Sequence, residues 1–364
     1  MSRQSTPPAL PLVPSSFFGI VLGLAGLGSD WRAAHAAWGL PAAIGEWIYA
    51  AAGGVWTVVT VLFALKWVVA VSTAREEAEH AVQCCFIGLA GVATMLVAQG
   101  ALPHSRALAI ALFVLGAGFT LLFALWRTGV LWRGGRDAAG NTPVLYLPTV
   151  AGSFVTGIVA AALGWKELAE LAFGAGVFSW LAIESVLLHR LYTAAALAPA
   201  LRPTLGIQLA PPAVAAGCYV ALGGSADLFA HMLIGYAVLQ ALLLTRLIGW
   251  IREQPFSASY WAFTFGATAL AGAATRFAIQ TPDGLFAGLA PVLFALANLL
   301  VIAVAVGTLR LLLQGRLLAP ATLATPATAT AAPGAAAAAP AAPAAPADPV
   351  DPADVGPGTQ VPGH

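Results

Sequence analysis

Residue types that commonly carry out chemistry are few in this chain, and they form no familiar constellation. The cysteines form no CxxC pair, and no histidine combines with cysteine or carboxylate in a metal-binding motif. No nucleophile stands with a base in the pattern of a covalent catalyst. The residues considered are Cys84, Cys85, Cys218, His35, His80, His104, His189, His231 and His364. We therefore expect no enzyme activity, no metal site and no cofactor.

A glycine-rich run at Gly23–Gly28, GLAGLG, superficially resembles a nucleotide-binding loop. It follows no strand pattern and lies inside an apolar run, whereas phosphate-binding loops join a strand to a helix. Close packing between two helices is the better interpretation, because glycine lets their backbones approach.

The stretch Tyr260–Gly272, YWAFTFGATALAG, has four aromatic residues among its first six and mostly small residues after them. Thr264 and Thr268 are its two threonines. Two interpretations are open from these residues alone. The aromatic side chains pack in a core, as aromatic stripes usually do, or they line and obstruct a conduit.

The composition places these residues in a membrane protein. Of the 364 residues, 60% are hydrophobic and 9% are charged, whereas about a quarter are charged in a soluble domain. The mean hydropathy is +0.86, which leaves too little polar surface for a soluble globule of this length. A net charge of +1 also gives no electrostatic basis for binding nucleic acid.

Apolar runs of spanning length predict an all-α membrane protein with ten transmembrane helices. The predicted segments are 15–29, 45–71, 81–99, 106–132, 146–163, 166–193, 205–222, 226–251, 259–278 and 285–316. The even segments are long and rich in Leu, Val, Phe and Trp, and the odd ones are shorter and rich in small residues. The even segments end in basic residues about 60 residues apart, which indicates a helical hairpin repeated five times; these are Lys66, Arg127, Arg190, Arg246 and Arg310.

The small residues predict that the five odd helices pack inside and the even helices face lipid. Five inner helices around one axis leave a central pore, in a quasi-five-fold arrangement of hairpins. Pro148, Pro211 and Pro212 lie in odd segments, where we expect them to kink or break the helix.

Twelve of the 16 Lys and Arg residues lie on the side of the N-terminus, which predicts that both termini are cytoplasmic. These twelve are Arg3, Lys66, Arg75, Arg127, Arg133, Arg136, Arg190, Arg202, Arg246, Arg252, Arg310 and Arg316. Residues 1–14 form a cytoplasmic N-terminal segment, 15–316 the channel domain, and 319–364 an Ala/Pro-rich tail that we expect to be disordered. A regulatory role for the tail is the alternative.

We expect the interiors of the odd segments to carry no ionisable residue. Such an absence argues against a cation channel and against a proton-coupled carrier, because both commonly place ionisable residues at membrane depth. Basic residues such as Arg246 and Arg252 at the mouths then favour anions. One carboxylate remains, Glu184 in the sixth segment. It is either a gating or proton-linked group or a structural carboxylate paired with a neighbouring arginine.

Three stretches resemble the TehA tellurite-resistance family, which includes plant guard-cell slow anion channels and fungal malate permeases. They are PSSFFGIVLGLAGLGSDWR at 14–32, SWLAIESVLLHRL at 179–191 and PFSASYWAFTFGATALA at 255–271. The resemblance covers about residues 12–316. It implies a homotrimer in the inner membrane, with a separate anion-conducting pore in each protomer and kinked inner helices.

The resemblance also implies a phenylalanine of the ninth helix that plugs the pore, and Phe265 matches that position. Phe263 is two positions away and points elsewhere on a helix, so it is the competing candidate. Phe86 matches a contributing phenylalanine of the third helix. Gly266 stands where plant relatives have proline, and Thr264 and Thr268 are further pore candidates.

Two functions follow from this resemblance. The first is a gated anion channel, linked by family to tellurite resistance, whose partners are small inorganic or carboxylate anions and the lipid bilayer. The alternative is an ion-coupled transporter of C4-dicarboxylates such as malate.

Overall fold

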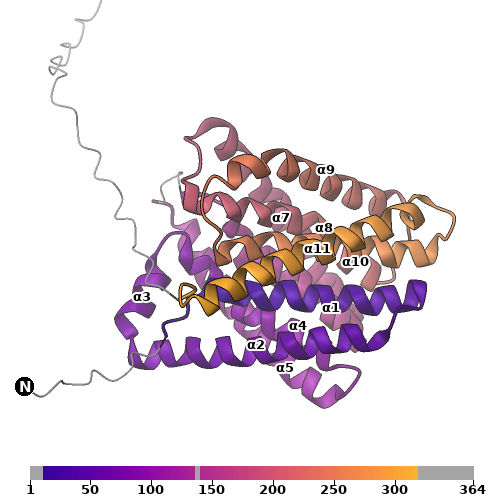
Figure 1. The fold of residues 1–364 in the computed structure, drawn as a ribbon, viewed down its shortest axis with the longest axis horizontal. Coiled ribbons are helices and arrows are strands. Elements are labelled where there is room, and N and C mark those ends of the chain that lie inside the picture. The colour runs from indigo at the N-terminus through magenta and orange to yellow at the C-terminus, as the bar shows by residue number, and fades with distance from the viewer. Residues whose placement is uncertain (1–10, 136–139, 319–364) are drawn as a thin grey trace, which may run out of the picture. The chain divides into compact units, whose positions relative to one another are not determined.

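The computed structural model describes residues 11–135 and 140–318, all of which belong to one compact unit. Within these ranges the chain forms helices and connecting turns, and no strand (Figure 1). The predicted tail 319–364 and most of the predicted N-terminal segment 1–14 lie outside the described residues.

Long and short helices alternate along the chain, as predicted. The long helices are α2 (Ala42–Val69), α5 (Arg106–Trp132), α7 (Lys166–Thr193), α9 (Leu228–Ile251) and α11 (Leu285–Leu313). The helices between them are α1 (Phe18–Trp38), α4 (Leu89–Ala101), α6 (Gly152–Leu163), α8 (Ala210–Ala221) and α10 (Thr264–Gln280). A short polar helix that the sequence analysis did not predict, α3 (Val71–Glu79), follows α2.

Each of the helices α1, α4, α6, α8 and α10 is preceded by helical turns that are tighter or wider than those of an α-helix. They are the 3-10 segments η1 (Ser15–Phe17), η2 (Gln83–Gly88), η4 (Pro143–Leu145), η6 (Pro199–Leu209) and η7 (Ala258–Phe263), and the π-helical η5 (Leu147–Ala151). We call each combination a broken segment. The predicted prolines lie at these breaks: Pro148 is in η5, and Pro211 and Pro212 are in the first turn of α8. Proline is tolerated there because a first-turn N–H has no partner within the helix.

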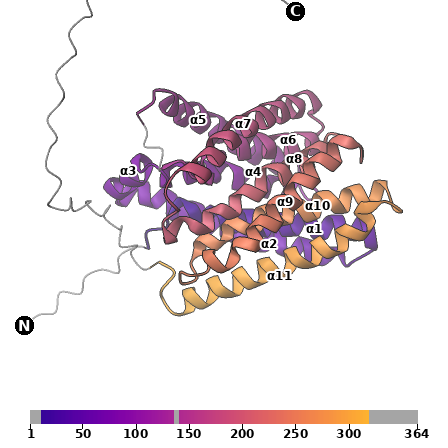
Figure 2. The same cartoon turned by 90° about the horizontal axis from the view of Figure 1, so that it is seen from above.

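The broken segments contact one another in a closed order. Helix α1 contacts α4, α4 contacts α6, α6 contacts α8, α8 contacts α10, and α10 contacts α1 again. Each also packs against the long helix that follows it in the chain, so α1 pairs with α2 and α10 with α11. Figure 2 shows α5 and α7 on one side of this unit and α11 on the opposite side.

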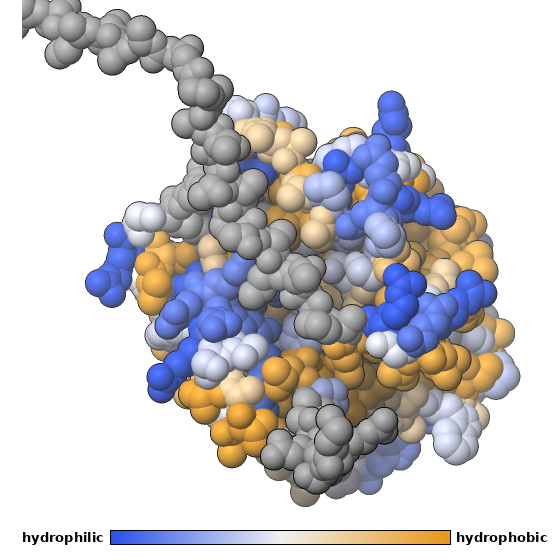
Figure 3. Space-filling model, turned by 60° about the vertical axis from the view of Figure 1, so that its left-hand side comes forward, coloured by the Kyte–Doolittle hydropathy of each residue, from blue (hydrophilic) through white to orange (hydrophobic). Residues whose placement is uncertain are grey.

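Burial separates the two sets of helices in the way that their composition predicts. Along the most apolar stretch of each spanning helix, 22–33% of residues are buried in the long helices and 61–72% in broken segments. The exposed side chains of the long helices include many Leu, Val and Trp residues, which suit contact with lipid. On the end of the unit that carries α3, hydrophilic patches lie beside hydrophobic residues (Figure 3).

Within the described residues, nine helical segments are long and apolar enough to cross a membrane. The predicted first span is not among them. Helix α1 extends to Trp38 rather than ending at residue 29, and Gly39, whose φ of 69° suits glycine, caps its end. Its second half therefore includes Asp30, Arg32 and His35, which lower its hydropathy.

Glycines of α1 bring it close to α10. A Cβ at Gly23 would lie less than 3.0 Å from the Thr264 side chain, and one at Gly26 less than 3.0 Å from that of Thr268. Both threonine hydroxyls donate to carbonyls of their own broken segment, Thr264 to Trp261 at 2.8 Å and Thr268 to Thr264 at 3.0 Å. The GLAGLG run is thus a helix-packing surface, as predicted.

Candidate functional site

Two cavities lie between the broken segments, and each is lined by residues from all five of them. The first cavity, of about 110 Å³, is lined by Ser16, Phe86, Tyr146, Thr204 and Trp261 among others. The second cavity, of about 290 Å³, is lined by Gly26, Gln99, Ala161, Gly217 and Thr268 among others. Along every broken segment, the residues that line the first cavity precede those that line the second.

Two residues line both cavities, Phe265 and Val214. Phe265 is only partly buried, and its ring lies 3.5 Å from the place where a Cβ of Gly26 would sit. Val214 belongs to the neighbouring helix α8. An aromatic ring and a branched aliphatic side chain therefore stand where the two cavities meet. The sequence analysis singled out Phe265 but missed Val214, which no motif distinguishes from the other valines.

The other predicted pore residues divide between the cavities and the helix interfaces. Phe86 is partly buried in η2 and lines the first cavity, and Thr268 lines the second. Thr264 is buried against α1. Gly266 faces η6 and α8, where a Cβ would lie 2.9 Å from the Ala210 backbone nitrogen.

Phe263 lies in a different environment from Phe265. Its ring stacks on Tyr260 with centroids 6.1 Å apart and presses against Gly206. It is buried and lines neither of the two cavities. The two phenylalanines thus point in different directions, as their spacing on a helix requires.

The two arginines predicted at the pore mouths, Arg246 and Arg252, are exposed near the end of α9. Neither lines either cavity. Any effect they have on ions in the cavities acts at a distance through solvent, which screens it.

The prediction that the interiors of the short helices carry no ionisable residue is wrong. Asp30 in α1 and Arg276 in α10 line the second cavity, and they are its only charged lining residues in the described part of the chain. The prediction fails because α1 is longer than predicted, which places Asp30 inside it, and because Arg276 already lies within the predicted range 259–278 and inside α10. None of the described residues that line the first cavity is charged.

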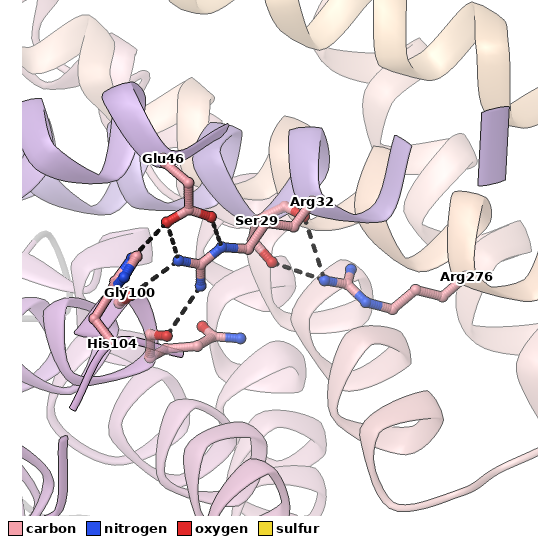
Figure 4. A network of polar contacts seen from close by, with 7 residues as sticks. Ser29, Arg32, Glu46, Gly100, His104 and Arg276 are labelled. Carbon is pink, nitrogen blue, oxygen red and sulfur yellow. Dashed lines mark hydrogen bonds and ion pairs between the residues drawn. The ribbon is translucent and has the colours of Figure 1, made fainter. Parts of the chain in front are cut away.

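A second arginine at this end, Arg32, is fully engaged. It forms a bidentate ion pair with Glu46, at 2.7 and 2.8 Å, and donates to the carbonyls of Gln99 and Gly100 at the end of α4 (Figure 4). His104 also contacts Glu46 at 2.8 Å. Arg32 therefore ties together the ends of α1, α2 and α4.

Arg276 is held differently, by a single neighbouring residue. Figure 4 shows its guanidinium reaching from α10 toward Ser29 in α1. Its Nη2 donates to Ser29 Oγ at 2.7 Å, and the Ser29 carbonyl lies at 3.5 Å. This contact joins residues 247 positions apart in the sequence.

Glu184 is buried among four hydrogen-bond donors. Its carboxylate accepts from Tyr146, from Trp180 at 2.9 Å, from Tyr236 at 2.6 Å and from Gln240 at 3.4 Å. The expected arginine partner is therefore wrong for the described residues, because phenol, indole and amide groups satisfy this carboxylate instead. Tyr146 also lines the first cavity, so Glu184 holds part of that wall.

No group of three or more His, Cys, Asp or Glu side chains in the described ranges could hold a metal ion. The described residues that line the two cavities are apolar side chains, hydroxyls, the amides of Gln83 and Gln99, and one pair of opposite charges. Such a lining can accommodate small polar species.

Comparison with known proteins identifies this architecture. Residues 13–309 match the SLAC1 family, described as voltage-dependent anion channel. The chain belongs to the SLAC1 family. The match spans all five broken segments, so both cavities lie within the family domain.

Two relatives illustrate the range of this SLAC1 family. The chain is 36% identical over 269 residues to the tellurite resistance protein TehA homolog of Haemophilus influenzae, covering 73% of this chain and 81% of the relative. It is 26% identical over 318 residues to the S-type anion channel SLAH3 of Arabidopsis thaliana, covering 83% of this chain and 49% of the relative. The protein is a multi-pass membrane protein of a family of anion channels and transporters, and the resemblance to the TehA family is confirmed.

Proposed function

We propose that this protein is a gated anion channel whose conduit runs through the five broken segments and is closed at Phe265. The observation that carries the proposal is the position of the Phe265 ring, which lines both cavities where they meet. The closed order of contacts among α1, α4, α6, α8 and α10 supports one central path. An apolar ring obstructs ions because they cannot shed water without replacement ligands.

Anion selectivity is supported by what lines this path. In the described part of the chain, no carboxylate lines the first cavity, and the second holds one guanidinium, which offsets its one carboxylate. The relatives are named as anion channels or a tellurite resistance protein, and a link to tellurite resistance is part of the proposal. We also propose a homotrimer with one conduit in each protomer.

The direct test is the current carried by purified protein in planar bilayers. With gradients of potassium chloride, nitrate or malate, the reversal potential should follow the anion gradient. A reversal potential that followed potassium would contradict the anion proposal. The series across three anions also ranks the permeant species.

An ion-coupled transporter of C4-dicarboxylates is the second candidate, and Asp30 is the observation that favours it. A buried carboxylate on the path is a feature that coupled carriers use, and Asp30 is 2% exposed beside the second cavity. Saturable, proton-dependent malate uptake into vesicles would favour the carrier. Large currents without saturation would favour the channel.

The proposed location is the inner membrane with both termini in the cytoplasm, which rests on the distribution of Lys and Arg. A periplasm-active reporter fused after Arg316 should be silent, and one inserted beside Lys166, at the start of α7, should be active. The reverse pattern would exchange the two mouths and place the second cavity on the cytoplasmic side.

A further inference from the structure

The second cavity holds two opposite charges that face each other without forming an ion pair. Asp30 Oδ1 and Arg276 Nη1 each lie less than 3.0 Å from the point where a Cβ of Gly272 would sit. Arg276 nevertheless forms its hydrogen bonds with Ser29. Because Gly272 has no side chain, the space between carboxylate and guanidinium is open.

The carboxylate of Asp30 is incompletely satisfied. Asp30 is 2% exposed, and its Oδ2 has no hydrogen-bond partner among the described residues. Arg276 is only partly buried, and the hydrogen bonds found for its guanidinium are those of Nη2. Leaving a buried carboxylate oxygen unpaired costs free energy, and a direct contact with the guanidinium would remove part of that cost. The arrangement is therefore one that a third group, placed between the two, would complete.

The chemistry of that third group follows from the two sides of the gap. The guanidinium requires an acceptor that carries negative charge, and the carboxylate requires a hydrogen-bond donor. Chloride and nitrate only accept, so close to Arg276 they would face the negative charge of Asp30. An oxyanion that keeps one hydroxyl hydrogen accepts from Arg276 and donates to Asp30 at once.

We propose that the second cavity is a binding site for small monovalent oxyanions that retain a hydroxyl hydrogen, held between Arg276 and Asp30. The cavity volume of about 290 Å³ accommodates such an anion together with water. Gln99 and Ser29 also line the cavity and supply further polar contacts. This proposal rests on the proposed function, because the anion reaches the cavity through the proposed conduit. It adds the class of anion that the conduit binds.

Hydrogen carbonate and nitrate are matched probes, since both are planar, carry one negative charge and differ in the hydroxyl hydrogen. In the full-length purified protein at constant pH and ionic strength, hydrogen carbonate should raise the unfolding temperature saturably and at lower concentration than nitrate. Asp30→Asn should reduce the apparent affinity for hydrogen carbonate by roughly tenfold or more, with a smaller change for nitrate. Arg276→Gln should weaken the binding of both anions.

The matched control is Asp227→Asn, which makes the same change of charge at the start of α9, outside both cavities. It should leave both apparent affinities unchanged. Should Asp30→Asn fold poorly, Gly272→Ala is a second route, because its methyl group fills the gap; it too should abolish the preference for hydrogen carbonate. Equal effects of Asp30→Asn and of Gly272→Ala on the two anions, or a wild-type protein without the preference, would overturn the proposal.

Bi-ionic reversal potentials in bilayers separate this proposal from the proposed function. A wild-type protein that conducts no anion contradicts the channel, while the unfolding experiment still reports on the site. A wild-type channel whose permeability ratio of hydrogen carbonate to nitrate is unchanged in Asp30→Asn contradicts the binding site alone. The expected result is conduction by both proteins, with a ratio several-fold lower in the variant.

Discussion

Phe265→Ala is expected to raise anion conductance by roughly tenfold or more, because it removes the ring that stands where the two cavities meet. A tenfold change corresponds to a barrier lower by about 1.4 kcal/mol. This change is small compared with the free energy that an ion needs to pass an apolar constriction. The measurement is single-channel or macroscopic current in planar bilayers at matched protein amounts. Expression and oligomer size should be unchanged, since Phe265 is only partly buried.

Phe263→Ala is the matched control, two positions away in the same segment. Its buried ring packs on Tyr260 and Gly206, so its loss should cost about 3–5 kcal/mol of stability and should not raise conductance. A rise with Phe263→Ala and none with Phe265→Ala would move the obstruction by two residues. If neither variant raised the current in folded protein, the obstruction by an aromatic ring would be refuted.

Gly116→Ala is expected to destabilise the protein by about 1–3 kcal/mol, because its methyl group has no room. A Cβ at Gly116 would lie 2.7 Å from the Gly91 carbonyl oxygen and 3.0 Å from the Met95 backbone nitrogen. Backbone atoms cannot turn aside as a side chain can, so α4 and α5 would have to separate. The measurement is the midpoint of thermal unfolding in one detergent.

The control lies two residues further along the same helix. A Cβ at Gly118 would meet nothing within 4 Å, so Gly118→Ala should leave the midpoint unchanged or raise it slightly, since alanine favours a helix. If both variants lowered the midpoint equally, the close approach of α4 and α5 would not explain the loss of stability. The loss would then reflect the flexibility that glycine gives to helix α5.

Much of the helical order could be predicted because lipid imposes it. The predicted ranges 106–132 and 166–193 agree with α5 and α7, since a spanning helix needs a long apolar run with polar ends. The first segment was predicted too short, because Asp30 and Arg32 were read as the end of the helix. A polar residue that faces a cavity does not interrupt a helix, and its direction is not visible in the sequence.

The pore candidates show the same limit at the level of single residues. Phe265 was selected by resemblance, and spacing alone separated it from Phe263. Neither the resemblance nor the helical spacing could predict that Val214 lines both cavities or that Asp30 approaches Arg276. The positions of these side chains depend on how α1, α8 and α10 are rotated about their axes. The 3-10 turns that precede each of these helices change the direction in which the following side chains point.

The sequence by itself determined that this protein is an all-helical membrane protein of alternating long and short segments, with glycines at the helix contacts. Hydrophobic run length, small residues and basic ends carry that information locally, because the bilayer acts on each segment separately. Only the tertiary structure decided which side chains line the two cavities, and that Ser29 and Asp30 meet Arg276 from far along the chain. The physical reason is that contacts between distant segments set two things. They set the rotation of each helix after its 3-10 or π break, and they set the closed packing of the five helices.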